Sequence, residues 1–377
     1  MTTSLPPVPY FDWDNRYPDW TEQVVAAVRE VAESDEFILK SRVAALETAV
    51  KERTGARHAV AVASGTGALT VILTALGLGE GDEVVTPAFS FISTASTVAL
   101  RGARPVFADV DPDTACLDLA AAEAAVTRHT RAVLPAYLFT THPDMTGLAA
   151  LAQRHGIALV EDSAVGLGAT VDGRPAGRFG RAGVYSFFPA KPIGGAGDAG
   201  MIVTDDDDLA RDMRMLRNHG QDLGVRFLHH TVGFNCRMDE ITAAFLLQRL
   251  PHLDEFLNAR RRIAEEYQER LAHLAPDVLT PPDGYRDRAV YTYVVRAQRR
   301  DELKEFLAGE GIETVVYYPK PLHLQPAFAH LGHQEGDFPV AERISREALA
   351  LPLHPDMRPG DVARVASAVE RFYRRSR

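Results

Sequence analysis

Between residues 58 and 204 the chain alternates short apolar runs with amphipathic stretches of helical length. The runs have the length of buried strands, and the first of them, residues 58–63, is followed by a predicted helix at residues 67–76. Such alternation predicts a mainly parallel sheet that is covered by helices on both faces. The other expected strands are residues 83–85, 105–107, 132–134, 157–160, 184–187 and 201–204.

Beyond residue 235 the pattern changes. Residues 238–267 are typical of a long helical stretch, which Pro251 interrupts. The later elements that we expect are strands at residues 290–295 and 314–318 and helices at residues 300–307 and 359–374. The sequence therefore predicts an α/β chain with two domains. The larger would span residues 1–250, with an N-terminal arm at residues 1–20, and a smaller C-terminal α+β domain would span residues 251–377.

Composition excludes several classes of protein. The net charge of −10 argues against general affinity for nucleic acid, which depends on basic surface. No apolar run approaches the roughly 18 residues that cross a membrane, and the N-terminus lacks the pattern of a signal peptide. The two cysteines, Cys116 and Cys236, have no CxxC spacing and suit a reducing compartment. We therefore expect a cytoplasmic protein.

Lys191, one of only five lysines, stands in an unusual local sequence, SFFPAKPIGGAGDAG at residues 186–200. It follows an aromatic run and precedes several glycines, which allow backbone to approach a bound ligand closely. A lysine in such a pocket loses hydration, and this favours its neutral, nucleophilic form. The pattern suits a Schiff-base lysine, although a structural or phosphate-binding lysine is an equal alternative on residue type alone.

Three further groups lie at the ends of predicted strands, where α/β sheets bind their ligands. The run ASGTGA at residues 63–68 enters a helix with small residues, which suits an anion site or simply a tight turn. Glu161 and Asp162 follow the strand at residues 157–160, and only one of them should face the site because adjacent strand residues point oppositely. Either Phe89 or Phe91 could stack on a planar cofactor or belong to the core. Phosphate cradle, carboxylate, ring and lysine together suit pyridoxal phosphate (PLP).

Two other motifs are weaker. Gly195-x-Gly197-x-x-Gly200 has the spelling of a dinucleotide fingerprint but precedes a predicted strand instead of a helix, which disfavours an NAD-dependent oxidoreductase. Asp109, Asp111 and Asp113 begin like a calcium loop that lacks its glycine and closing glutamate. No histidine spacing indicates zinc, and we expect no metal site.

The run at residues 186–200 and four other motifs resemble the nucleotide-sugar aminotransferases of the DegT/StrS group, which belong to the aspartate aminotransferase superfamily. The matches follow in order over about residues 55–355. The other motifs are VEDSA at residues 160–164, RNHG at 217–220, GFNCRMDE at 233–240 and YPKPLH at 318–323. The resemblance implies a fold-type I PLP-dependent transferase. Among members of the group, the chain is most similar to the dTDP-4-keto-6-deoxyhexose aminotransferases of antibiotic deoxysugar pathways.

The resemblance also implies roles for individual residues. Lys191 would hold the cofactor covalently, and Asp162 would pair with its pyridine nitrogen. Phe91 would stack on the cofactor ring. The residues expected to bind the cofactor's phosphate within the subunit are Gly65, Thr66 and Ser186. Asn235 would reach the phosphate of the cofactor in a partner subunit, which implies a homodimer with shared active sites. The residues expected to contact substrate are His219, Arg237, Tyr317, Tyr318 and His323.

Two positions depart from the family pattern. Val165 stands where a glutamine near the cofactor's phenolic oxygen is usual, and valine cannot donate that hydrogen bond. Tyr317 stands where many members have histidine. The first departure affects the tuning of the cofactor, and the second affects the sugar pocket.

The function that the resemblance implies is amino transfer from L-glutamate to a nucleotide-linked keto sugar through PLP and its amino form, pyridoxamine phosphate (PMP). We expect transfer to C-4 of dTDP-4-keto-6-deoxyglucose, with dTDP-4-amino-4,6-dideoxyglucose as product; the alternative substrate is a dTDP-3-keto-6-deoxyhexose. A sugar 3-dehydratase that uses the same cofactor is another alternative. The presence of Lys191 disfavours it, because the related 3-dehydratases carry histidine at this position. A regulatory or sugar-binding protein on a retired enzyme scaffold is a further alternative.

Overall fold

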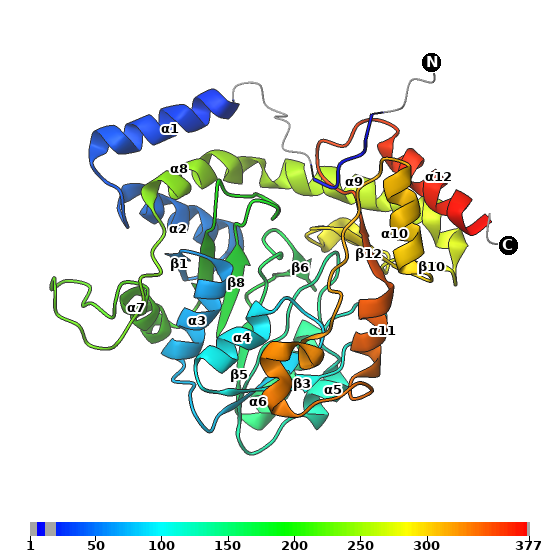
Figure 1. Cartoon of the computed structure of the whole chain (residues 1–377). Coiled ribbons are helices and arrows are strands. Elements are labelled where there is room, and N and C mark those ends of the chain that lie inside the picture. Colours follow the sequence, from blue (N-terminus) through cyan, green and yellow to red (C-terminus); the bar gives the residue numbers. More distant parts are fainter. Residues whose placement is uncertain (1–5, 12–19, 375–377) are drawn as a thin grey trace.

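A computed structural model describes residues 6–11 and 20–374 (Figure 1). Its centre is a seven-stranded sheet in which only β9 runs against its neighbours. This arrangement confirms the predicted α/β class with a mainly parallel sheet. The strands, in sheet order, are β1 (His58–Val62), β9 (Gly200–Thr204), β8 (Ala182–Ser186), β5 (Ala158–Glu161), β4 (Thr130–Val133), β2 (Glu83–Pro87) and β3 (Arg104–Ala108).

Helices cover both faces of the sheet, as the alternation of strand side chains requires. In β1, Ala59 and Ala61 join one hydrophobic core, while Val60 and Val62 join another on the opposite face. The first core includes residues of α2 (Ser41–Thr54), α6 (Met145–His155) and α8 (Glu240–Arg249). The second includes residues of α3 (Gly65–Ala75), α4 (Ser93–Leu100) and α7 (Asp207–Leu216). The remaining α-helices of this half are α1 (Trp20–Ser34), which packs on α8, and the short α5 (Leu119–Ala124).

A separate hydrophobic core lies in the C-terminal part, on the right of Figure 1. The long α9 (Leu253–Leu271) serves both parts, because Leu253 and Leu257 join the first sheet core and Ala264, Tyr267 and Leu271 join the C-terminal core. The division between residues 250 and 251 therefore stays a prediction. The other elements here are β10 (Val278–Leu279), β11 (Tyr293–Ala297), β12 (Ala348–Leu351), α10 (Arg300–Gly309), α11 (Pro339–Glu347) and α12 (Asp361–Arg374).

The predicted N-terminal arm is described only in part. Residues 1–5 and 12–19 lie outside the described residues. Residues 6–11 lie against the C-terminal core, where the Val8 amide donates to the Gly311 carbonyl at 2.8 Å and the Val8 carbonyl accepts from the Glu313 amide at 3.0 Å. This part of the arm therefore braces the smaller half of the molecule.

The predicted strand at residues 314–318 is wrong. Only Val315 pairs there, in an isolated bridge with Ala350. The third strand of the small sheet is instead β12, which follows α11 directly and which the sequence prediction missed. The strand expected at residues 290–295 begins only at Tyr293, because the Tyr291 backbone bonds outside the sheet, its amide to the Phe139 carbonyl and its carbonyl to Arg260.

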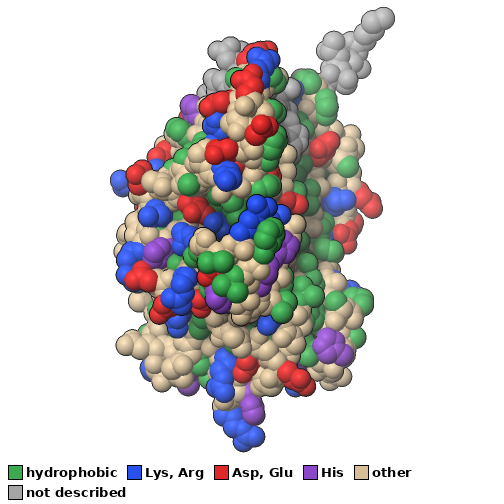
Figure 2. Space-filling model, turned by 90° about the vertical axis from the view of Figure 1, so that its left-hand side faces the viewer, with side chains coloured by type: hydrophobic (Ala, Val, Ile, Leu, Met, Phe, Trp, Pro, Cys, Tyr) green, Lys and Arg blue, Asp and Glu red, His purple; other side chains and the backbone are tan. Residues whose placement is uncertain are grey.

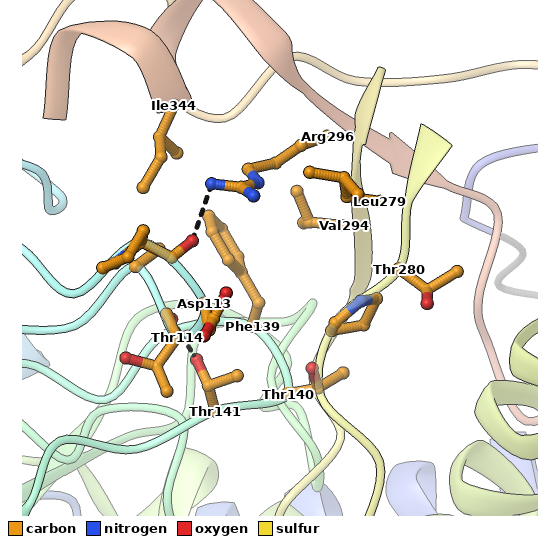
Figure 3. Close-up of a pocket in the computed structure, with 13 residues that line it drawn as sticks. Asp113, Thr114, Phe139, Thr140, Thr141, Leu279, Thr280, Val294, Arg296 and Ile344 are labelled. Atoms are coloured by element: carbon orange, nitrogen blue, oxygen red, sulfur yellow. Dashed lines mark hydrogen bonds between the residues drawn. The ribbon is translucent and has the colours of Figure 1, made fainter. Parts of the chain in front are cut away.

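A small pocket marks a junction between the two halves (Figure 3). Arg296 of β11 reaches across it and donates to the Pro112 carbonyl at 2.7 Å, while Thr141 donates to the Thr114 carbonyl at 2.7 Å. The first bond fixes the C-terminal half against the loop that follows β3, and the second joins the loops that follow β3 and β4. Across residues 6–11 and 20–374, no helix is long and apolar enough to cross a membrane.

Candidate active site

The first part of the site is the N-terminus of α3, which follows β1 directly. Ser64 caps the helix by accepting the Gly67 amide at 3.0 Å, so the helix begins at Gly65, two residues earlier than predicted. The amides of Gly65 and Thr66 have no acceptor among the described residues. A Cβ on Gly65 would lie 3.1 Å from the Cβ of Ser186, so this glycine, the two free amides and the serine form one small cradle. Free amides at a helix N-terminus suit a phosphate.

The two neighbouring carboxylates separate as the sheet geometry requires. Glu161 is fully buried and accepts the amides of Gly177 and Gly180, each at 2.8 Å, and the Tyr137 hydroxyl at 3.0 Å. Burial raises its pKa, and these bonds oppose the effect. Glu161 is therefore satisfied by the fold itself.

Asp162 points to the other side. Its Oδ2 accepts the hydroxyl of Thr94 on α4 at 2.8 Å. Burial raises the pKa of Asp162, while Thr94 and the nearby charge of Lys191 oppose the rise. Asp162 Oδ1 also accepts the Ala164 amide at 3.4 Å. A buried carboxylate with only neutral donors is poorly compensated, which suits a cationic partner such as a protonated ring nitrogen. Thr94 was not found from the sequence, since nothing in its surroundings marks it.

Lys191 is desolvated and lies close to Asp162. Burial lowers the pKa of Lys191 to about 8, and Asp162 opposes that shift. The Lys191 Nζ lies 4.2 Å from the centre of the Tyr291 ring. Sequence reasoning missed Tyr291 as well, because it lies 100 positions from Lys191 in a segment without a motif.

The pKa of Lys191 predicts how the cofactor-free protein captures PLP. Only the neutral amine attacks an aldehyde, and a folded-state pKa below the usual 10.5 frees it at lower pH. The rate of PLP capture should rise with pH through a midpoint near 8. It can be measured from the growth of visible absorption in buffers from about pH 6 to about pH 11. A rate that climbs only above about pH 10 would show an ordinary solvated lysine.

The structure distinguishes the two candidate stacking rings. Phe89 is fully buried in a core cluster, whereas Phe91 is 54% exposed and lies 6.2 Å from the Tyr318 ring, centre to centre. Phe91 is therefore the ring that remains free to cover a ligand. Free helix amides, a poorly compensated carboxylate, a desolvated lysine and an open ring fit PLP.

Close packing behind the cradle makes Gly67 sensitive to substitution. A Cβ at Gly67 would lie 2.4 Å from the Cys236 Sγ. Gly67→Ala should therefore destabilise the fold by about 1–3 kcal/mol and weaken cofactor retention. Thermal melting and cofactor content after dialysis would measure both effects. The double variant with Cys236→Ala should recover most of the loss, and no recovery would contradict this packing account.

Three of the expected phosphate and substrate residues share a surface segment. His219 and Asn235 are exposed and lie on facing strands of an irregular ribbon, in which the His219 amide donates to the Phe234 carbonyl at 2.8 Å. Arg237 donates to Asn218 Oδ1 at 3.1 Å. This ribbon carries the projecting loop of residues 221–232 beside α7 (Figure 1). The contact of Cys236 with Gly67 places its base behind the cradle.

The other expected substrate residues divide into two groups. Tyr317 and Tyr318 lie among aromatic rings beside the site, with Tyr317 centred 6.1 Å from Phe139. His323 is 1% exposed, and its Nε2 lies 3.1 Å from Glu342 Oε1. This packing favours a structural role for His323.

The two remaining sequence features have structural explanations. Val165 is buried among apolar side chains of the first core. Asp111 Oδ1 accepts the amides of Asp113 and Thr114, as in a tight turn. Within the described part of the chain, no group of acidic, histidine or cysteine residues has the arrangement of a metal site.

Known proteins resemble the chain over nearly its full length. The DegT/DnrJ/EryC1/StrS aminotransferase family matches residues 18–370. A pleiotropic regulatory protein of Geobacillus stearothermophilus is 42% identical over 370 residues, covering 97% of this chain and 99% of that protein. The dTDP-3-amino-3,4,6-trideoxy-alpha-D-glucose transaminase of Streptomyces venezuelae is 38% identical over 373 residues, covering 98% and 97%.

The fold agrees with a solved relative. The crystal structure of S. venezuelae DesV, in complex with a ketimine intermediate, superposes with a TM-score of 0.93 at 38% identity, covering 98% of this chain and 99% of that one. This agreement confirms the fold-type I architecture. The chain belongs to the DegT/DnrJ/EryC1/StrS aminotransferases, a family of PLP-dependent nucleotide-sugar transaminases.

Proposed function

We propose that this protein moves the amino group of L-glutamate to C-3 of a nucleotide-linked keto-6-deoxyhexose. The placement of the Lys191 amine beside Asp162 supports the transaminase chemistry most strongly. The choice of C-3 draws on the S. venezuelae relative, whose name gives a 3-amino sugar. Transfer to C-4 of dTDP-4-keto-6-deoxyglucose, which the overall resemblance favoured, is the alternative.

Each residue of the site would have a different role in such a reaction. PLP supplies the electron sink that makes a carbon–hydrogen bond next to the amine acidic. The cradle of Gly65, Thr66 and Ser186 would bind its phosphate, and Phe91 would cover one face of its ring. Asp162 would keep a proton on the ring nitrogen, since a buried carboxylate strongly favours a positive partner. The Lys191 Nζ, freed by the amino donor, would carry the proton between the amine-bearing carbon of the substrate and the cofactor.

The two substrate positions can be separated by direct product analysis. Purified protein, PLP and L-glutamate would be incubated with the 3-keto and the 4-keto dTDP-sugar in parallel, and the products examined by NMR. We expect an amine at C-3 and at least about a tenfold preference in kcat/KM for the 3-keto sugar. A preference for the 4-keto sugar would reverse the assignment. No turnover of either sugar would favour the regulatory reading that the G. stearothermophilus relative's name supports.

We also propose that the protein is a homodimer that joins through the face with the loop of residues 221–232. This loop exposes apolar side chains, among them Val232 at 90%. In Figure 2, which looks onto this side of the molecule, hydrophobic and charged side chains lie interspersed. Exposed apolar residues that gather in one segment are typical of an interface. The exposed large apolar residues of the loop are Leu223, Val225, Phe227, Leu228 and Val232.

Charge in this loop should break the dimer. Light scattering should give twice the chain mass of 41.2 kDa for the parent protein. Phe227→Asp with Val232→Asp should shift the mass toward a single chain, because burial of two carboxylates opposes association. Leu100→Asp, at a residue that is 71% exposed at the end of α4, is the matched control and should stay dimeric. A double variant that remains dimeric would contradict the proposed interface.

A further inference from the structure

Tyr291 lies against the reactive lysine without belonging to any motif of the sequence. The Lys191 Nζ lies 4.2 Å from the centre of its ring, which is within the range where an aromatic face attracts a cation. The attraction is stronger in desolvated surroundings than in water. Both groups are desolvated, because burial lowers the pKa of Lys191 and raises that of Tyr291.

The position of the Tyr291 ring is fixed from several directions. Its amide donates to the Phe139 carbonyl at 3.0 Å, and its carbonyl accepts from the buried Arg260 at 2.8 Å. Its hydroxyl interacts with the Tyr317 hydroxyl, which raises the pKa of Tyr291 further. The backbone of Tyr291 is thus held between the sheet side of the molecule and the C-terminal half.

The N-terminal segment adds a brace behind this pair. Tyr10 places its hydroxyl 2.7 Å from Thr292 Oγ1, next to Tyr291 in the chain, and its ring lies 6.4 Å from the Tyr317 ring. The Tyr10 amide donates to Glu313 Oε2 at 3.0 Å. A line of hydroxyl and ring contacts therefore runs from the arm through Tyr317 to Tyr291.

From this geometry we propose that Tyr291 is a positioning residue, whose ring holds the Lys191 amine beside Asp162 and stabilises its protonated state. The proposal rests on the proposed transaminase function for its purpose, but its physical claim concerns two side chains of this chain. Tyr317, which departs from the family's usual histidine, would serve to fix that ring. Amine and carboxylate would then stay aligned when the lysine is released from the cofactor.

Other charged and titratable groups around the pair are few. Asp162 faces the amine, and its charge raises the pKa of Lys191. Tyr318 is half-buried near Asp162 and Tyr291, and its raised pKa keeps it neutral. Arg260 lies behind Tyr291, and Arg249 bonds the Ile193 carbonyl two residues from the lysine. Substitutions at Tyr291 would leave the side chains of all four in place.

The test compares loss of the ring with loss of the hydroxyl alone. Tyr291→Leu removes the aromatic face, whereas Tyr291→Phe keeps it. The readout is the pH midpoint at which the visible absorption of the lysine-bound cofactor changes, a property that is independent of turnover. We expect Tyr291→Leu to lower the midpoint by about half a unit to one and a half units, because the protonated nitrogen loses its cation–π partner. Tyr291→Phe should stay near the parent.

A control separates this effect from general damage. Tyr285 packs in the C-terminal core, so Tyr285→Leu should lower the melting temperature and leave the midpoint unchanged. An unchanged or raised midpoint in Tyr291→Leu would overturn the proposal, as would an equal shift in Tyr285→Leu.

A second measurement needs no bound cofactor. Carbon-13 methylation of the five lysines, with the Lys191 signal assigned by its absence in Lys191→Ala, gives the pKa of the amine by NMR. The pKa should fall in Tyr291→Leu by a similar amount. If the parent protein binds no PLP, the proposed function fails, and this titration still decides the role of Tyr291.

Discussion

Replacing Lys191 with alanine should abolish amino transfer, with a loss of at least about 10⁴-fold in kcat, and should remove the visible absorption of lysine-bound cofactor. The size of the effect follows from two roles in one side chain, covalent attachment and proton transfer. No other lysine is placed to substitute, since Lys40, Lys304 and Lys320 are exposed and Lys51 is a partly exposed residue of α2. Steady-state kinetics and absorption spectra measure the two losses separately.

A matched variant makes this result specific. Lys304→Ala removes an exposed lysine of α10 and should leave both kinetics and spectrum unchanged. The Lys191→Ala protein should melt near the parent temperature in the absence of cofactor, because burial of an ammonium does not stabilise a fold. Turnover that survives in Lys191→Ala would remove the basis of the proposed function.

Asp162→Asn should lower kcat by about 10²–10³-fold while leaving the fold intact. Asparagine keeps the size of the side chain and can still accept the Thr94 hydroxyl. It loses the negative charge that would hold a proton on the ring nitrogen. The half-reaction with L-glutamate alone can be measured from the rate at which visible absorption disappears. A slower rate in Asp162→Asn would place the defect in the first half of the reaction.

The preceding residue supplies the control. Glu161→Gln changes a carboxylate that faces backbone amides on the other side of the sheet, so an amide nitrogen would meet donors there. We expect a loss of roughly 1–3 kcal/mol in the free energy of unfolding and nearly normal kcat per folded molecule. If instead Glu161→Gln lost the activity and Asp162→Asn lost the stability, the assignment of the two carboxylates would be reversed.

The sheet could be predicted from the sequence because each strand is a separate apolar run. The alternation also required that Glu161 and Asp162 point apart, but it could not say which faces the ligand, since both follow the same strand. That choice came from the family resemblance. The structure supplies its physical reason, namely the amides of Gly177 and Gly180 that meet Glu161.

The errors and omissions arise from contacts distant in the sequence. Residues 314–318 have the composition of a strand, yet only Val315 finds a partner. The four residues of β12 follow α11 without a turn signal, and short apolar runs do not distinguish helix from strand. Thr94 and Tyr291 act through side chains that the fold brings from 68 and 100 positions away. No local sequence pattern predicts such contacts.

Amino transfer by this protein requires that PLP, held by Lys191, take an amino group from a donor and pass it to a keto sugar. The visible spectrum of the purified, cofactor-loaded protein tests it most directly, recorded first alone, then with L-glutamate, then with the keto dTDP-sugar. We predict that glutamate removes the absorption of the lysine-bound cofactor and that the sugar restores it. A protein that shows no such absorption even with added PLP, or whose absorption glutamate leaves unchanged, would contradict the account.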